Sequence, residues 1–184
     1  RIRKLYVYAQ VLMSCSTSKA KYATNNTPEE FWNEWKEQKI EPHEIERIKH
    51  LVVVDETRNK IIARRQSSIY FNKEKEERIE CLLTEEFALT QQDILLTAVA
   101  APERLLDLAN NFILYDKGIK KIARYQQYFA VKNAMRQITG LHTKPRPGGV
   151  IWHTQGSGKS LTMALLAEAI AKDKTIKNPI ILLV

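Results

Sequence analysis

The sequence contains little that would build a disulfide framework or a metal site. Among its 184 residues there are two cysteines, Cys15 and Cys81, and neither has a close-spaced partner. The four histidines likewise lack the short spacings of metal ligands. We therefore expect a reduced protein in which neither disulfides nor zinc hold the fold.

Long apolar runs are also missing. No stretch approaches the roughly 18 consecutive apolar residues that a membrane-spanning helix needs. Arg1, Arg3 and Lys4 precede only a short, tyrosine-containing stretch and not the apolar core of a signal peptide. With 44% hydrophobic and 27% charged residues, the composition is that of a globular protein. The sequence therefore predicts a cytoplasmic protein with no membrane partner.

Acidic residues are absent from one long part of the chain, residues 117–167. This stretch holds nine of the 29 basic residues, so the remainder is close to neutral although the net charge is +8. A segment of one charge sign suits a polyanionic partner such as nucleic acid. The alternative is an ordinary solvated helix face.

The N-terminal part predicts two strands and a helix. Residues 5–15 are rich enough in β-branched and aromatic side chains to form a strand, and residues 19–23 are suited to pair with it. Thr27–Glu30 predicts a helix start, with a threonine cap, a proline and two acids in the first turn. The apolar face of this helix would consist of Phe31, Trp32 and Trp35.

From residue 90 onward the pattern is helical. Pro102 is expected to start a helix whose leucines and Phe112 face the core, and a second helix is expected from Tyr125 to Gln137. Two connectors are expected around the turn Asp116–Gly118, namely Phe112–Leu114 and Ile119–Ile122. The Pro/Gly-rich run at residues 144–149 marks a linker.

The C-terminal part predicts a β-loop-α-β unit. It consists of a strand at residues 150–153, a loop, a helix from Lys159 to about Lys172 and a buried strand at residues 179–184. A unit that stops on its second strand is not a complete sheet. We therefore expect a fragment of a larger protein.

The segment His153-Thr154-Gln155-Gly156-Ser157-Gly158-Lys159-Ser160 predicts a phosphate-binding loop for ATP. Its glycines permit close approach of the backbone, and the amides from Gln155 to Ser160 are expected to point at the phosphates. Lys159 is expected to act catalytically by reaching the β- and γ-phosphates, and the Ser160 hydroxyl to coordinate Mg²⁺. One departure is His153, which stands where the general pattern has glycine. The alternative is a plain Gly-Ser turn between a strand and a helix.

A second nucleotide-binding element is predicted at Arg124-Tyr125-Gln126-Gln127. A glutamine amide both donates and accepts, so a fixed Gln127, with Arg124 beside it, can select adenine by paired hydrogen bonds. The element precedes the loop by some 30 residues and lies in the basic segment. This setting favours the functional interpretation over an ordinary helix start.

Two further motifs are incomplete. Leu51–Glu56 has the composition of the Mg²⁺-binding strand of motor ATPases, but in such motors that strand follows the phosphate loop, whereas here it precedes it. Glu34-Trp35-Lys36 has the Glu-x-Lys spacing of metal-dependent nucleases. Such a centre needs an earlier aspartate, and the first one here is Asp55. We therefore expect a strand end at the first motif and no complete nuclease centre at the second.

Three segments of the sequence resemble the R (HsdR) subunit of type I restriction enzymes. They are LYVYAQVLMSCSTSKAKYATNNTPEEFWNEWKE, QQDILLTAVAAPERLLDLANNFILYDKGIKKIARYQQYFAVKNAM and GGVIWHTQGSGKSLTMALLAEAIA, together about 100 residues. The resemblance implies a PD-(D/E)xK nuclease domain, two RecA-like helicase lobes and a helical region that docks the methyltransferase. It also implies ATP-dependent translocation of double-stranded DNA and then cleavage, in a bacterial or archaeal complex with methyltransferase (M) and specificity (S) subunits.

The resemblance divides the chain into two parts. Residues 1–115 would be the C-terminal part of the nuclease domain with a helical linker, and residues 39–90, including the charged stretch 73–80, an insertion. Residues 116–184 would start the first RecA-like motor lobe. The implied fold class is α/β, a partial nuclease-type α+β region followed by an incomplete RecA-like parallel sheet.

The resemblance also assigns roles. Lys159 and Ser160 take the phosphate and Mg²⁺ roles, and Gln127 with Arg124 takes the place of the adenine-reading Gln motif. The nuclease carboxylates are expected before Arg1. The remaining motor motifs, including the arginine finger, are expected after residue 184.

The predicted enzyme is therefore an ATP-dependent type I site-specific deoxyribonuclease. The chain alone is expected to be inactive, because the second half of the ATP site would be missing. An alternative is a superfamily 2 helicase or remodelling motor without nuclease activity, in which residues 1–115 are an accessory domain. A third possibility is a module that holds ATP or DNA without chemistry.

Overall fold

The computed structural model describes residues 6–37, 89–140 and 148–182, and the single positions His43, Glu56, Asn59, Lys60, Ala63 and Arg64. The chain divides into two compact units, one made of Arg1–Glu37 with Gln91–Val184 and the other of Gln38–Thr90. The predictions for residues 51–55 and 73–80 lie outside the described residues. Among the residues that are described, no helix is long and apolar enough to cross a membrane.

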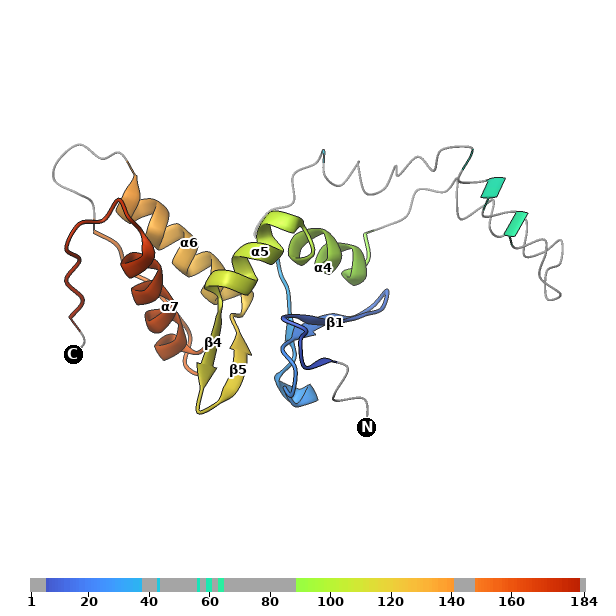
Figure 1. Cartoon of the computed structure of the whole chain (residues 1–184), viewed down its shortest axis with the longest axis horizontal. Coiled ribbons are helices and arrows are strands. Elements are labelled where there is room, and N and C mark those ends of the chain that lie inside the picture. The colour runs from blue at the N-terminus through green and yellow to red at the C-terminus, as the bar shows by residue number, and fades with distance from the viewer. Residues whose placement is uncertain are drawn as a thin grey trace. The chain divides into compact units, whose positions relative to one another are not determined.

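The N-terminal segment forms a three-stranded antiparallel sheet in the order β1-β2-β3, drawn in blue in Figure 1. β1 (Leu12–Cys15) pairs with β2 (Ala20–Ala23), and β2 pairs with the short β3 (Asn33–Glu34). Between β1 and β2 the Ser16 N–H donates to the Lys19 carbonyl at 2.7 Å. The predicted pairing of residues 19–23 with the first strand is confirmed.

One expectation for this segment is confirmed only in part, and another is wrong. The first strand begins only at Leu12, because the Ala9 N–H donates to the Tyr6 carbonyl at 3.1 Å and closes a turn. The expected helix is a single 3₁₀ turn, η2 (Glu29–Phe31), after which the backbone becomes extended. Trp35 is buried, with 2% of its surface exposed, whereas Phe31 is 56% exposed. Burial of the large Trp35 ring outweighs the local helix signal, which is a weak preference.

Two helices follow, α4 (Gln91–Val99) and α5 (Pro102–Asn111). α4 packs on β1 and β2, and the Gln91 N–H donates to the Thr17 carbonyl at 3.1 Å. α5 starts at Pro102 as predicted. Leu108 and Phe112 are buried on its core side, but Leu106 is exposed.

The expected connectors instead form a β-hairpin of β4 (Ile113–Asp116) and β5 (Ile119–Ile122). Lys117 and Gly118 link the strands with φ values of 50° and 78°. A type I′ turn needs positive φ at both central residues, and its twist matches that of paired strands. This turn brings the two segments into register, so they pair with each other.

The last two helices, α6 (Tyr125–Thr139) and α7 (Lys159–Lys172), pack against each other (Figure 1). Both were predicted, and α7 has the predicted bounds. The strands expected at residues 150–153 and 179–184 are not strands where they are described. A strand needs a neighbour to complete its hydrogen-bond ladder, and no described strand pairs with either segment. The described part is a mixed α/β fold with two small antiparallel sheets, and a RecA-like parallel sheet is not among its elements.

One hydrophobic core joins the N-terminal sheet to each of the four helices. Its members include Tyr22, Trp35, Leu95, Leu108, Phe112, Tyr128 and Leu165. Two side chains of the N-terminal segment also bond to the backbone at β5: the Tyr22 hydroxyl donates to the Ala123 carbonyl at 2.8 Å, and Thr24 Oγ1 to the Lys120 carbonyl at 2.6 Å. Burial raises the pKa of Tyr22. The N-terminal segment is thereby fastened to the element that leads into α6.

Candidate functional site

The predicted phosphate-binding loop ends at the N-terminus of α7. Gly156 and Gly158 have φ values of 78° and 82°, a left-handed conformation that favours glycine. Gly158 caps α7 and provides no side-chain hydrogen bond to it. The first α7 amide bonded within the helix is that of Thr162, which donates to the Gly158 carbonyl at 3.1 Å. The start of α7 therefore presents backbone N–H groups and the positive end of the helix dipole, as an anion site does.

Lys159 and Ser160 are the first two residues of α7, and both are exposed. Thr162, one half-turn further on, is buried, and its Oγ1 lies 3.3 Å from the Gly158 carbonyl. The first turn of α7 thus carries both exposed and buried polar side chains. Lys159 and Ser160 are available to a ligand, while Thr162 anchors the loop to the helix.

The loop is also braced internally. Ser157 Oγ donates to the Thr154 carbonyl at 2.7 Å, and the Ser157 N–H lies 3.3 Å from the same oxygen. His153 Nδ1 lies 3.2 Å from Ser157 Oγ. Sequence reasoning treated His153 only as a departure from the glycine of the general pattern. The structure shows that its ring reaches across the loop to Ser157.

Gln127 lies under the loop, in the first turn of α6, with only 2% of its surface exposed. Its Nε2 donates to the carbonyls of Ser157 at 3.3 Å and Gly158 at 3.1 Å. Its Oε1 accepts from the Arg124 N–H at 2.9 Å, so one amide joins the start of α6 to the loop. The structure therefore brings Gln127 and the loop together. Reading of adenine by Gln127 stays a prediction.

A cavity of about 370 Å³ adjoins the loop. Gly156, Gly158 and Leu161 line it from the loop side, and Arg124 and Gln127 from the start of α6. Residues of β5 and of the N-terminal segment complete the lining, among them Ile119, Ile122, Thr27, Pro28, Phe31 and Asn33. The N-terminal residues were missed by sequence reasoning. No local pattern marks them, because they stand far from the loop in the sequence.

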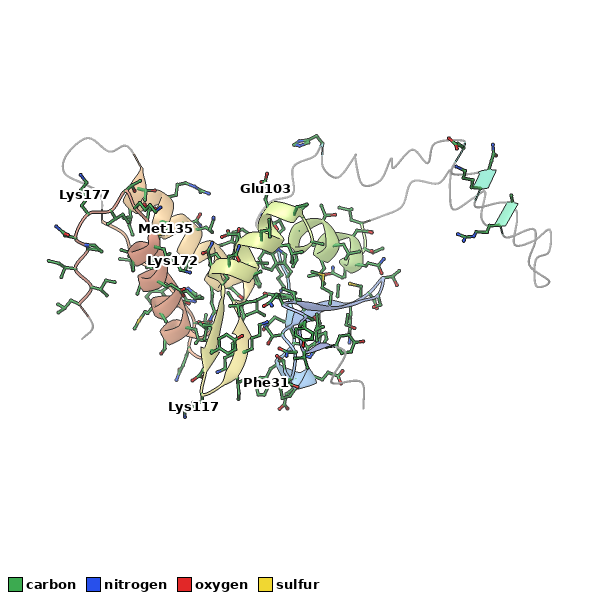
Figure 2. The ribbon with its side chains drawn as sticks, in the orientation of Figure 1. Phe31, Glu103, Lys117, Met135, Lys172 and Lys177 are labelled. Atoms are coloured by element: carbon green, nitrogen blue, oxygen red, sulfur yellow. The ribbon has the colours of Figure 1, made fainter. Side chains whose placement is uncertain are left out.

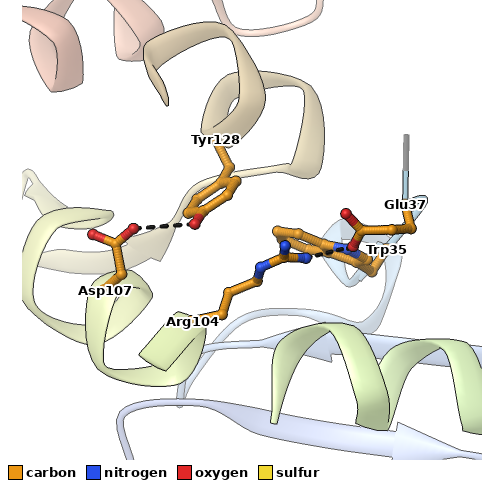
Figure 3. A network of polar contacts seen from close by, with 5 residues as sticks. All are labelled: Trp35, Glu37, Arg104, Asp107 and Tyr128. Carbon is orange, nitrogen blue, oxygen red and sulfur yellow. Dashed lines mark hydrogen bonds and ion pairs between the residues drawn. The ribbon is translucent and has the colours of Figure 1, made fainter. Parts of the chain in front are cut away.

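Next to Gln127, the α6 side chain Tyr128 belongs to a polar network shown in Figure 3. The Arg104 guanidinium pairs with Glu37 and lies 5.5 Å from the ring centroids of both Trp35 and Tyr128. Such contacts combine an ion pair with cation–π attraction. The network ties the end of the N-terminal segment to α5 and, through Tyr128, to the α6 residue that follows the loop-contacting glutamine.

Asp107 completes the network. It accepts hydrogen bonds from Tyr128 at 3.1 Å, Lys132 at 3.0 Å and Asn111 at 2.9 Å. Burial opposes ionisation of Asp107, but these bonds outweigh burial and lower its pKa. Burial, together with the Asp107 charge, raises the pKa of Tyr128 to about 12. Tyr128 is therefore a neutral donor and Asp107 a charged acceptor at neutral pH.

Residues outside the acid-free basic segment bond to three of its lysines. Lys132 pairs with Asp107 at 3.0 Å, and Lys121 with Asp116 at 2.5 Å. Lys120 Nζ donates to Gln10 Oε1 at 2.5 Å, and burial lowers its pKa. Lys121 and Lys132 are ion-paired within the molecule, so the charge available to a polyanion is smaller than the sequence count indicates.

The two incomplete motifs hold no metal site where they are described. Within the described residues no group of three or more His, Cys, Asp or Glu side chains is placed to hold a metal ion. Glu34 lies in β3, and Trp35 beside it belongs to the core. Glu56, at the end of the other motif, forms an ion pair with Lys60 at 2.6 Å.

Comparison with known proteins supports the family resemblance found in the sequence. The model of the SWI2/SNF2 ATPase family matches residues 126–184. The HindI endonuclease subunit of a type I restriction enzyme from Haemophilus influenzae is 40% identical over 97 residues, which are 49% of this chain and 9% of that protein. No solved structure matches the chain.

Two proteins of Methanocaldococcus jannaschii are also similar. The putative type I restriction enzyme MjaIXP endonuclease subunit is 36% identical over 97 residues, covering 50% of this chain and 9% of that protein. The putative type I restriction enzyme MjaVIIIP endonuclease subunit is 37% identical over 119 residues, covering 61% of this chain and 12% of that protein. The chain thus spans about a tenth of the length of these relatives. The resemblance seen in the sequence is confirmed: the chain is a homologue of the endonuclease (R) subunits of type I restriction enzymes, with a SWI2/SNF2 ATPase match at its C-terminal end.

Proposed function

We propose that this chain supplies the ATP-binding loop of a type I restriction R subunit, in which ATP drives translocation of double-stranded DNA before cleavage. The observation that carries the proposal is the N-terminus of α7, which has no side-chain cap and follows two left-handed glycines. The relatives of this chain in Haemophilus influenzae and Methanocaldococcus jannaschii are named as endonuclease subunits of type I restriction enzymes.

The residues fit the phosphates of ATP in three ways. The first backbone amides of α7 have no carbonyl of a preceding turn to bond, so they are free by geometry to meet phosphate oxygens. The Lys159 ammonium is exposed at the same helix end, where it provides a charge for the β- and γ-phosphates. The exposed Ser160 hydroxyl is the oxygen that the loop offers to Mg²⁺. Mg²⁺ bound with ATP would neutralise phosphate charge.

Arg124 and Gln127 are proposed to complete nucleotide binding. Both line the cavity beside the loop, and Arg124 is exposed. The two protons on Gln127 Nε2 are committed to loop carbonyls, but Oε1 accepts from one donor and retains a second lone pair. Gln127 would thus position the loop and still offer an acceptor to an adenine amino group.

The domain assignment remains part of the proposal. Residues 1–115 are assigned to the nuclease side and residues 116–184 to the start of a RecA-like lobe. The compact unit that joins Arg1–Glu37 to Gln91–Val184 contains parts of both. On this assignment the two sides share a hydrophobic core through Tyr22, Trp35 and Tyr128. Double-stranded DNA and the M and S subunits are the proposed partners.

The ATP site is tested by measuring ATP affinity of the protein and of the Lys159→Ala variant. We expect a loss of about tenfold to a hundredfold, the usual value of a hydrogen bond from a charged group. Lys172→Ala is a matched control, because it removes a lysine from the other end of the same helix, where it pairs with Glu168 at 2.7 Å. Equal ATP affinity of wild type and Lys159→Ala would sink the proposal.

The SWI2/SNF2 match favours a second candidate, a superfamily 2 motor without nuclease activity. The two are separated by mixing the product of the complete reading frame with M and S subunits and unmethylated DNA. ATP-dependent cleavage that is lost in Lys159→Ala supports the restriction function. Translocation without cleavage supports the motor alone.

A further inference from the structure

We propose that the cavity beside the loop receives the base and ribose of the bound nucleotide, and that Phe31 of the N-terminal segment forms its stacking wall. The inference rests on the proposed ATP site and extends it to a residue from the opposite end of the chain. The cavity measures about 370 Å³, within the usual range for small-molecule sites. Gly156 and Gly158 belong to both the loop and the cavity lining, so the two spaces are continuous.

The cavity adjoins the loop, and a bound triphosphate needs a site there for its base and ribose. A triphosphate held at the start of α7 has its base and ribose outside the loop, and these need a surface within reach. Gly158, Gln127, Arg124 and residues of β5 all line this one cavity. A nucleotide anchored by its phosphates therefore reaches the cavity without leaving the loop.

The lining has the chemistry of a base site. Phe31, Ile119 and Leu161 provide apolar surface, and Phe31 and Ile119 are 56% and 54% exposed although they are large and hydrophobic. An exposed aromatic ring offers a flat face on which a nucleobase can stack. Asn33 and Arg124 add polar groups to the lining, suited to the base edge or the ribose.

The wall that carries Phe31 is held in place. Thr24 Oγ1 donates to the Lys120 carbonyl of β5 at 2.6 Å and lies 2.9 Å from Thr27 Oγ1. Trp32 Nε1 donates to the Thr27 carbonyl at 3.1 Å, and the Phe31 N–H to the Pro28 carbonyl at 3.0 Å. η2 is therefore fixed between two bonded neighbours, and Phe31, labelled in Figure 2, projects from a supported turn.

This arrangement makes the N-terminal segment a part of the nucleotide site. The contact would report nucleotide occupancy to the segment that the proposed function assigns to the nuclease side. A base from single-stranded DNA has the same stacking chemistry. The phosphate loop at the cavity edge favours the nucleotide, and the experiment distinguishes the two sources.

The test compares the binding of ATP, of inorganic tripolyphosphate and of single-stranded DNA to the intact protein. For Phe31→Ala we expect ATP affinity to fall about five- to 150-fold, the range for loss of one aromatic stack, while tripolyphosphate affinity stays unchanged. Phe31→Trp should retain ATP binding. Tyr115→Ala removes an aromatic residue that is 70% exposed on β4 and outside the cavity lining. It should therefore change neither the ATP affinity nor the tripolyphosphate affinity.

The outcomes separate this inference from the proposed function. If Lys159→Ala weakens both ATP and tripolyphosphate but Phe31→Ala weakens neither, the ATP site stands and the stacking wall is wrong. If Phe31→Ala weakens DNA binding alone, the cavity holds a DNA base and the inference is overturned. If Lys159→Ala changes nothing, the proposed function itself fails. Because Phe31 is exposed and outside the core, a folding defect is not expected, and far-ultraviolet circular dichroism of Phe31→Ala checks this.

Discussion

The contact between Gly158 and Gln127 leads to a quantitative prediction. An alanine Cβ at Gly158 would overlap the Gln127 amide nitrogen, whereas a Cβ at Gly156 meets no atom within 4 Å. Both glycines have nearly the same φ, 82° and 78°, so both substitutions carry the same backbone cost of about 1–2 kcal/mol. The two variants therefore differ only in whether the glutamine must move.

The additional cost at Gly158 follows from the hydrogen bonds of Gln127. Displacing its amide gives up the bonds from Nε2 to the Ser157 and Gly158 carbonyls. At roughly 0.5–1.5 kcal/mol for each net hydrogen bond, Gly158→Ala should destabilise the protein by about 2–5 kcal/mol. Gly156→Ala should destabilise it by about 1–2 kcal/mol.

The assay is urea-induced unfolding followed by tryptophan fluorescence, with the free energy of unfolding taken from the linear dependence on urea. In a Gln127→Ala background the overlap is gone, so Gly158→Ala should cost no more than Gly156→Ala. The expected coupling between positions 127 and 158 is about 1–3 kcal/mol. Equal costs of the two glycine substitutions in both backgrounds would show that Gln127 does not support the loop.

Three further predictions concern the network around Tyr128, the residue that follows Gln127. Arg104→Met should lower the free energy of unfolding by about 1–3 kcal/mol, because it takes away the ion-pair partner of Glu37 and removes the cation from the Trp35 and Tyr128 rings. Arg104→Lys should lose less stability, and Arg136→Met on the exposed surface of α6 should lose little. Similar urea midpoints for Arg104→Met and Arg136→Met would contradict the role of the network. The lowered pKa of Asp107 predicts a stability contribution that is present above its ordinary value of 3.8 and lost as the pH falls through the lowered value, so wild type should lose more stability than Asp107→Asn below about pH 4. The raised pKa of Tyr128 predicts a contribution that is present below pH 10 and lost as the pH rises toward about 12, and an ultraviolet titration of Tyr128→Phe should lack one late-ionising phenol.

Part of the architecture was predictable because its determinants lie close together in the sequence. The two glycines, Lys159 and the apolar spacing after them act within a few residues, so the loop and the bounds of α7 follow from local rules. The same holds for the start of α5 at Pro102 and for the turn at Asp116–Gly118, although the hairpin that this turn closes was not predicted. The strand predictions for residues 150–153 and 179–182 were wrong, because a strand also depends on a neighbouring strand, which the local sequence does not specify.

The sequence by itself predicted which residues would form a phosphate-binding loop, and it identified the family that the chain resembles. Only the tertiary structure decided that Gln127 bonds to that loop, that Trp35 is buried in the core and is not part of a helix, and that Phe31 lines the cavity. The physical reason is the range of the interactions. Backbone conformation and helix capping act over a few residues, whereas burial and long-range hydrogen bonds join residues about 30 to 100 positions apart, and depend on the packing of the whole unit.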